Sequence, residues 1–224
     1  MRGLSGNCQP YHDGGNVLRR RIITRWNEWF SEDNLSKDES ILSAPPSQGA
    51  ENAARAFLAR GKRFILDLAC GVGRDTCYLE GRGLAVIGVD ASFNGLRVAQ
   101  RVGLERGAIL ELITADARRL PFTDGSFEGV YCFGLLHEFV GQRREEDVGE
   151  VMGEIKRLLG DEGVLVLTVL SGEPEKGLPQ VQFHTRQMFE KATKGLQAIE
   201  VKAYDDVGCT GRTDYHVWYG VFEK

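Results

Sequence analysis

The residues best suited to chemistry surround a glycine-rich loop in the segment ILDLACGVGRDTCYL, residues 65–79. Gly71 and Gly73 follow an apolar run, and their missing side chains let backbone N–H groups approach a ligand closely. Asp67 lies within the apolar run, where a carboxylate repels a pyrophosphate and suits a ligand that carries a positive amino group. The pattern therefore predicts a ligand-binding loop whose specificity depends on the acids around it.

Two familiar glycine-rich loops do not match this segment. A phosphate-binding P-loop follows the pattern GxxxxGK[ST], and no lysine follows the glycines here. A dinucleotide-binding loop follows the pattern GxGxxG, and Thr76 stands where its third glycine belongs. A nicotinamide-dependent dehydrogenase is therefore only a remote alternative.

The segments that must position this loop alternate between strands and helices. Helix-like segments at 91–107 and 144–160 separate apolar runs, and Gly160 stands where a glycine ends a helix. The alternation predicts a parallel sheet with helices on both faces. Two final runs, joined by a polar segment without a helix, predict an antiparallel hairpin. The predicted strands lie at 64–69, 84–90, 109–116, 127–133, 163–170, 196–206 and 214–224.

The first fifty residues differ in character from the rest. Residues 17–30 carry apolar side chains at helical spacing, and a polar segment with Pro45 and Pro46 follows them. A second helix is predicted at 51–59. We therefore expect a helical cap or lid over residues 1–50 and a main domain over residues 51–224.

Four elements, taken in order, resemble the class I S-adenosylmethionine-dependent methyltransferases, and especially their small-molecule branch. DLACGVGRD resembles the first motif, Asp90 ends the second strand, TADARRL contains Asp116, and LPFTDGSFEGVYCFGLLHEF follows. The resemblance extends from about Phe64 to Leu170. It implies an α/β Rossmann-like fold with a mostly parallel, seven-stranded sheet in the order 3-2-1-4-5-7-6. The last strand is expected to be antiparallel, with helices on both faces and an N-terminal helical cap.

The resemblance also implies S-adenosylmethionine as the cofactor and S-adenosylhomocysteine as the product. Asp90 is expected to accept both ribose hydroxyls in charge-assisted hydrogen bonds of about 1.5–3 kcal/mol each. Asp116 is expected to accept from the adenine amino group, and the N–H of Ala117 to face the ring. The predicted cofactor-binding residues are Asp67, Ala69, Cys70, Gly71, Gly73, Arg74, Asp90, Ala91, Ser92, Asp116, Ala117 and Phe133.

Methyl transfer requires a nucleophile held in line with an already activated carbon, and the exclusion of water. His137 is the candidate catalytic base; the alternative is a histidine that hydrogen-bonds its loop or contacts the cofactor. Tyr11, Trp26, His137 and Phe183 are predicted to line the acceptor pocket, and no metal site is expected.

Composition narrows the class of partner. The formal net charge is -4 and no basic face is evident, which disfavours a nucleic-acid partner. The five irregularly spaced cysteines and the lack of a long apolar run predict a reduced, cytoplasmic protein without a membrane partner. The sequence leaves the oligomeric state open.

The expected function is therefore methyl transfer from S-adenosylmethionine to a small-molecule acceptor. A protein or nucleic-acid methyltransferase working with a partner, and a non-catalytic S-adenosylmethionine-binding protein, remain as alternatives. The segment WNEWFSEDN, together with the arginine of the glycine-rich loop, has a faint similarity to the tellurite-resistance and thiol methyltransferases. That similarity adds soft chalcogen nucleophiles to the candidate acceptors.

Overall fold

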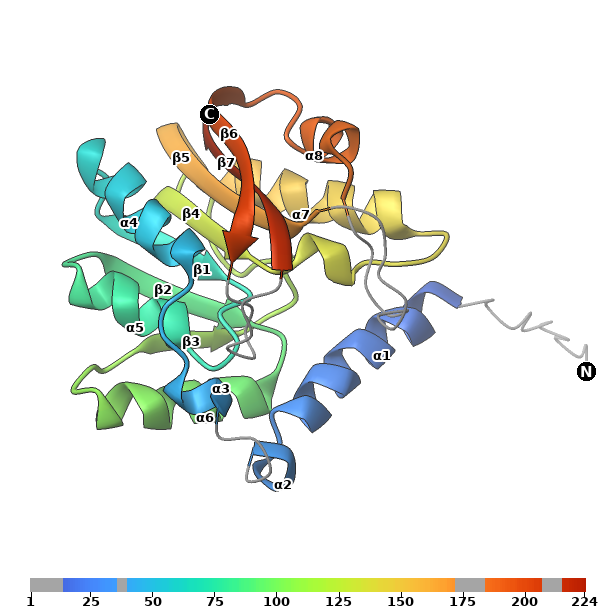
Figure 1. Cartoon of the computed structure of the whole chain (residues 1–224). Coiled ribbons are helices and arrows are strands. Elements are labelled where there is room, and N and C mark those ends of the chain that lie inside the picture. The colour runs from blue at the N-terminus through green and yellow to red at the C-terminus, as the bar shows by residue number, and fades with distance from the viewer. Residues whose placement is uncertain (1–13, 36–39, 172–183, 207–214) are drawn as a thin grey trace, which may run out of the picture.

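The computed structural model describes residues 14–35, 40–171, 184–206 and 215–224 (Figure 1). A seven-stranded sheet in the order β3-β2-β1-β4-β5-β7-β6 forms its centre. Strands β1 to β5 pair in parallel, and β7 is antiparallel to both β5 and β6. The predicted fold class, strand order and antiparallel last strand are confirmed. The strands are β1 (Phe64–Leu68), β2 (Ala85–Asp90), β3 (Glu111–Thr114), β4 (Phe127–Phe133), β5 (Leu159–Leu170), β6 (Gln197–Asp206) and β7 (Tyr215–Glu223).

Helices cover both faces of the sheet. Helices α4, α5 and α6 form a layer on one face, α7 and α8 cover the other, and α1 lies outside both layers beside α6 (Figure 1). None of the described helices is both long and apolar enough to cross a bilayer. The helices are α1 (Gly14–Trp29), α2 (Glu32–Leu35), α3 (Ser40–Ser43), α4 (Gln48–Ala59), α5 (Arg74–Gly81), α6 (Phe93–Glu105), the 3-10 helix η1 (Leu136–Glu138), α7 (Arg144–Leu158) and α8 (Arg186–Ala192).

Helix α7 shows why the helical pattern folds onto the sheet. Apolar residues recur every three or four positions and are buried, among them Val151, Ile155 and Leu158. Acidic residues occupy its first turn and Lys156 and Arg157 its last, which complements the helix dipole. The predicted end of this helix is wrong, however. Leu159 is already extended and begins β5, so Gly160 lies in a strand instead of capping the helix.

The opposite face of the sheet packs closely against α4. The side chain of Ser47 caps this helix by accepting a hydrogen bond from the N–H of Ala50 at 2.9 Å. The aromatic ring of Phe57 is fully buried over Gly129 of β4. The helix begins at Gln48, so it crosses the domain boundary predicted after residue 50. The division of the chain into two units stays a prediction.

A pair of glycine substitutions tests this packing. A Cβ at Gly129 would lie 2.6 Å from Phe57 Cε1 and 2.7 Å from Ile65 Cδ1. We expect Gly129→Ala to lower the free energy of unfolding by about 1–3 kcal/mol through overpacking. The control, Gly149→Ala in α7, meets no atom within 4 Å and should raise it by about 0.5–1 kcal/mol. Urea unfolding curves measure both; equal midpoints for the two variants would contradict the described packing.

Candidate functional site

The glycine-rich loop links β1 to α5 at the carboxyl ends of the strands. The backbone N–H groups of Ala69 and Cys70 both donate to the carbonyl of Val89 in the neighbouring strand, at 2.7 and 3.0 Å. Gly73 is left-handed, with φ of 73°, and a Cβ there would lie 2.9 Å from the Cβ of Ala99. A glycine is therefore required at this position by both its conformation and its packing.

Asp90 at the end of β2 binds this loop. Its carboxylate accepts the N–H of Gly71 at 2.9 Å and the N–H of Ser92 at 2.7 Å. Burial raises the pKa of Asp90 despite these hydrogen bonds, which favour the ionised form. The N–H of Ala115 donates to the carbonyl of Asp90 at 3.1 Å, so the next residue, Asp116, lies near Asp90. The structure thus brings the predicted residues of the first three strands together.

Asp67 is the most deeply buried acid of the loop region, with 2% of its surface exposed. The hydroxyl of Thr76 donates to its carboxylate at 2.6 Å. Burial raises the pKa of Asp67 to about 7, and the charges of Asp75 and Asp90 add to this rise. Thr76, which the sequence marked only as a missing glycine, is therefore the hydrogen-bond partner of the predicted site acid.

Arg74 and Asp75, the first residues of α5, are buried in a polar cluster. The carboxylate of Asp75 accepts from Arg74 Nε at 2.9 Å, from the N–H and hydroxyl of Ser47 at 2.9 and 2.7 Å, and from the Tyr131 hydroxyl at 3.0 Å. Burial alone raises the pKa of Asp75, but the charge of Arg74 and these hydrogen bonds outweigh it and lower the pKa. The guanidinium of Arg74 also lies over the ring of Phe133, at 5.6 Å. Neither Ser47 nor Tyr131 was predicted.

Asp116 and Ala117 lie between β3 and β4. Both oxygens of the Asp116 carboxylate accept from Arg118, through its N–H at 3.0 Å, its Nε at 2.9 Å and its Nη2 at 2.5 Å. Ala117 is half-buried and packs against the core on the α7 face of the sheet. Arg118 is a further unpredicted member of the site.

His137 and Glu138 lie in η1, directly after β4, and both are buried. His137 Nδ1 accepts the N–H of Leu170 at 3.4 Å, and its Nε2 lies 3.8 Å from the Glu138 carboxylate. Burial lowers the pKa of His137 to about 3, so the ring is neutral at pH 7. Glu138 forms an ion pair with Arg25 and accepts from Trp26 Nε1 at 3.3 Å. These contacts hold α1 against the rim of the sheet, which is the edge formed by the carboxyl ends of its parallel strands.

Asn27 provides a second attachment of α1. Its side-chain oxygen accepts from the hydroxyl of Ser92 at 3.0 Å and from the N–H of Asn94 at 3.1 Å, at the start of α6. The ring of Phe30 faces the glycine-rich loop, and a Cβ at Gly71 would lie 3.5 Å from it. Helix α1 therefore contacts both the loop side and the η1 side of the rim.

Comparison with known proteins identifies relatives. A family model described as a methyltransferase domain matches residues 66–167. The chain is 34% identical over 154 residues to a demethylmenaquinone methyltransferase of Thermus thermophilus, with 65% of this chain and 66% of that protein covered. It is 31% identical over 156 residues to a demethylmenaquinone methyltransferase of Thermobifida fusca, with 66% of this chain and 63% of that protein covered. The chain spans slightly less than two thirds of the length of these curated relatives.

A solved structure shares the whole fold. It is a Burkholderia thailandensis 1,6-didemethyltoxoflavin-N1-methyltransferase with bound 1,6-didemethyltoxoflavin and S-adenosylhomocysteine, at a TM-score of 0.64 and 19% identity. The match covers 99% of this chain and 93% of that one. Residues 66–167 match a methyltransferase domain, and the chain has the fold of the class I S-adenosylmethionine-dependent methyltransferases. The segment matched by the family model holds most of β1, all of β2 to β4 and most of β5, the strands whose ends carry the site.

Two residues of the predicted acceptor pocket, Tyr11 and Phe183, lie outside the described residues. The other two, Trp26 and His137, both contact Glu138, from different elements. The structure therefore brings together two predicted pocket residues that are separated by more than a hundred positions in the sequence.

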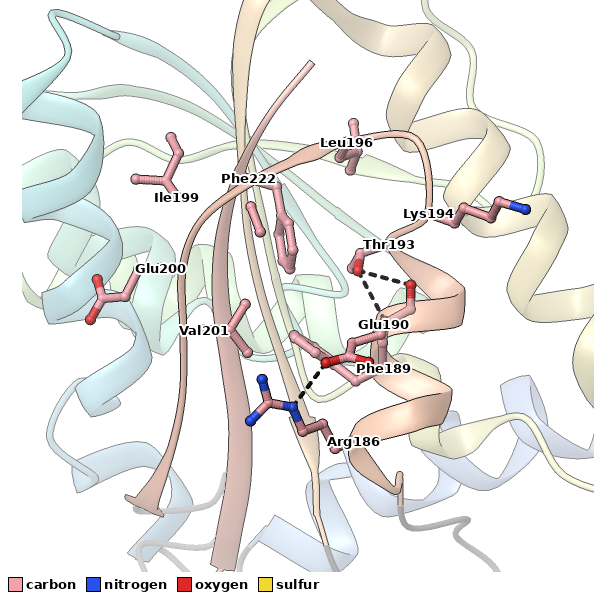
Figure 2. Close-up of a pocket in the computed structure, with 11 residues that line it drawn as sticks. Arg186, Phe189, Glu190, Thr193, Lys194, Leu196, Ile199, Glu200, Val201 and Phe222 are labelled. Carbon is pink, nitrogen blue, oxygen red and sulfur yellow. Dashed lines mark hydrogen bonds and ion pairs between the residues drawn. The ribbon is translucent and has the colours of Figure 1, made fainter.

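A groove of about 420 Å³ lies elsewhere on the protein, between α8 and strands β6 and β7 (Figure 2). Phe189 and Phe222 line it, and Arg186 and Glu190 form an ion pair beside it. The groove extends along β6 as far as Val201, which pairs with Gly220 opposite Leu167, so it does not reach the carboxyl end of β5 at Leu170. None of the predicted site residues lines this groove, and it is not the candidate site.

The buried acid Asp67 gives a pH-dependent stability. Its pKa is about 7 when folded and has an ordinary value of 3.8, so the unfolded chain releases this proton first as the pH rises. The resulting loss of stability grows from about pH 4 to pH 7 and is constant above. We expect Asp67→Asn to be more stable than the wild type at pH 8, by up to about 4 kcal/mol, because a tenfold change in proton affinity is about 1.4 kcal/mol.

Urea unfolding between pH 5 and pH 8.5 measures this difference, which should widen to pH 7 and then level off. The control, Asp161→Asn, replaces an exposed acid at the start of β5 and should follow the wild type throughout. A difference between Asp67→Asn and wild type that does not change with pH would refute the assignment.

Proposed function

We propose that this protein transfers the methyl group of S-adenosylmethionine to a small-molecule acceptor. The observation that carries the proposal is the pair of carboxylates at the glycine-rich loop, buried Asp67 and half-buried Asp90, of which Asp90 accepts the N–H of Gly71. Burial raises the pKa of both, so a ligand that brings hydroxyl donors and positive charge is favoured there. S-adenosylmethionine brings both, in its ribose and in its amino and sulfonium groups.

The residues present fit this cofactor by their chemistry. Asp90 would accept the ribose hydroxyls, and Asp67 would face the amino group. Asp116 would accept from the adenine amino group beside the N–H of Ala117. These roles follow the family resemblance, and the contact of Ala115 with Asp90 supports the proximity of the last two positions to the ribose site.

The bound cofactor supplies a methyl carbon already activated by its sulfonium charge. The protein then has to hold the acceptor in line with that carbon and to exclude water. Trp26 and Phe133 are aromatic side chains at the rim that suit a planar acceptor. Because the curated relatives are named for demethylmenaquinone, a quinol is the first acceptor class to test, with aromatic heterocycles, catechols, thiols and tellurite as the others.

His137 is best suited to positioning rather than to proton transfer. Its pKa of about 3 makes it a weak base at pH 7. The hydrogen bond from Leu170 to Nδ1 leaves the proton of the neutral ring on Nε2, which faces Glu138. We propose that His137 joins the loop after β4 to the end of β5. A group other than His137 would then take the proton of the acceptor.

The function is tested by S-adenosylhomocysteine release with each acceptor class, together with cofactor binding by calorimetry. We expect turnover with at least one class by the wild type. Asp90→Asn removes the charge that strengthens the ribose contacts, at about 1.5–3 kcal/mol, and should weaken cofactor binding roughly ten- to hundredfold. The control Asp161→Asn should bind as the wild type does.

Two outcomes would contradict the proposal in different ways. If the wild type does not bind S-adenosylmethionine, the assignment of the rim is wrong. If it binds the cofactor but releases no product with any acceptor class, the non-catalytic alternative holds instead.

The role of His137 is tested by His137→Gln, whose amide can accept from the N–H of Leu170 and donate toward Glu138. We expect turnover within about threefold of the wild type and an unchanged cofactor affinity. Removing a general base typically costs about 10²- to 10⁴-fold. A loss of that size, with cofactor affinity intact, would show that His137 takes the proton.

A further inference from the structure

A buried arginine, Arg118, binds the carboxylate of Asp116 on the side that faces the protein interior. The side chain of Arg118 is 7% exposed, whereas that of Asp116 is 39% exposed, so the guanidinium lies on the protein side and the carboxylate on the open side. Arg118 Nε and Nη2 donate to different oxygens of this carboxylate, at 2.9 and 2.5 Å. Such a fork fixes the plane of a carboxylate as well as its position.

The guanidinium is itself held from other elements. Arg118 Nη1 donates to the Asp147 carboxylate in the first turn of α7 at 3.0 Å. The guanidinium also lies 5.7 Å from the ring centre of Phe139, which follows η1. Arg118 is therefore held in place by groups outside its own loop. Its two hydrogen bonds to Asp116 in turn hold that carboxylate in place.

We propose that Arg118 is a positioning residue that orients Asp116 for the 6-amino group of adenine and so sets the selectivity for an adenine cofactor. The inference rests on the proposed function, since it takes S-adenosylmethionine as the ligand. A carboxylate accepts from an amino group and repels a carbonyl oxygen, and this discrimination depends on where the carboxylate is held. A lysine in place of Arg118 keeps the charge but loses the fork.

The test compares the dissociation constants of S-adenosylhomocysteine and S-inosylhomocysteine, in which a carbonyl replaces the amino group. One charge-assisted hydrogen bond corresponds to roughly a ten- to hundredfold preference of the wild type for the adenine ligand. We expect Arg118→Lys and Arg118→Met to reduce this ratio to less than about a third of its wild-type value. Asp116→Ala should remove the preference altogether.

The matched control is Arg119→Lys, which changes the adjacent, exposed arginine and should leave the ratio unchanged. A structural role alone would weaken both ligands equally, so an unchanged ratio in the Arg118 variants overturns the inference. If those variants do not fold, Asp147→Asn releases one end of the guanidinium in a milder way. It should lower the ratio too, and an unchanged ratio there is equally decisive against the inference.

The failure of the proposed function looks different. If the wild type binds neither ligand, the cofactor assignment is wrong and the inference fails with it. If the wild type binds the two ligands equally well, cofactor binding stands and only the role of Asp116 and Arg118 is overturned. Calorimetry reads out both without requiring a known methyl acceptor.

Discussion

The site depends on negative charge held at the strand ends without a cationic hydrogen-bond donor. Among the described contacts, Asp67 accepts only from a hydroxyl and Asp90 only from backbone N–H groups. Arg74 begins the helix that follows the same loop, but its guanidinium bonds to Asp75 instead. The fold therefore tolerates a local electrostatic cost that a cationic ligand would relieve, which is a familiar trade of stability for binding.

The N-terminal segment completes this rim from both sides. Ser47 donates twice to Asp75, and Asn27 accepts from Ser92 next to Asp90. Trp26 donates to Glu138 on the side where the acceptor is proposed to bind. Because these three side chains belong to the first fifty residues, the rim combines parts of the chain that the sequence analysis separated into two units.

The sequence predicted the elements of the sheet and the acids at its strand ends, because both leave local patterns. Each strand and each helix has its own spacing of apolar residues, and an acid at the end of an apolar run is visible in a short stretch of sequence. The strand order came from the resemblance to a family. The predicted end of α7 is wrong because glycine is common at the ends of helices and Gly160 therefore suggested a cap. In the structure Leu159 already pairs with Phe127 in the sheet.

Several polar partners of the site could not be predicted, because they join distant positions. Tyr131 and Asp75 are 56 residues apart, and Trp26 and Glu138 are 112 residues apart. Thr76 was visible in the motif, but only a structure shows that its hydroxyl meets Asp67. Burial of His137 likewise depends on β5 and α1, which no local pattern reveals.

The order of the last three strands has a consequence for how the chain folds. Among the described strands, β6 pairs only with β7, which is made later, so β6 has no strand partner until residues 215–223 exist. Asp206 at the end of β6 accepts the N–H groups of Gln48 and Gly49, across 158 and 157 residues. The start of α4 therefore gains these two hydrogen bonds only after residue 206 has been made. Contacts of such high sequence separation slow folding, and a nascent chain of this protein carries an unpaired strand until residues 215–223 are available.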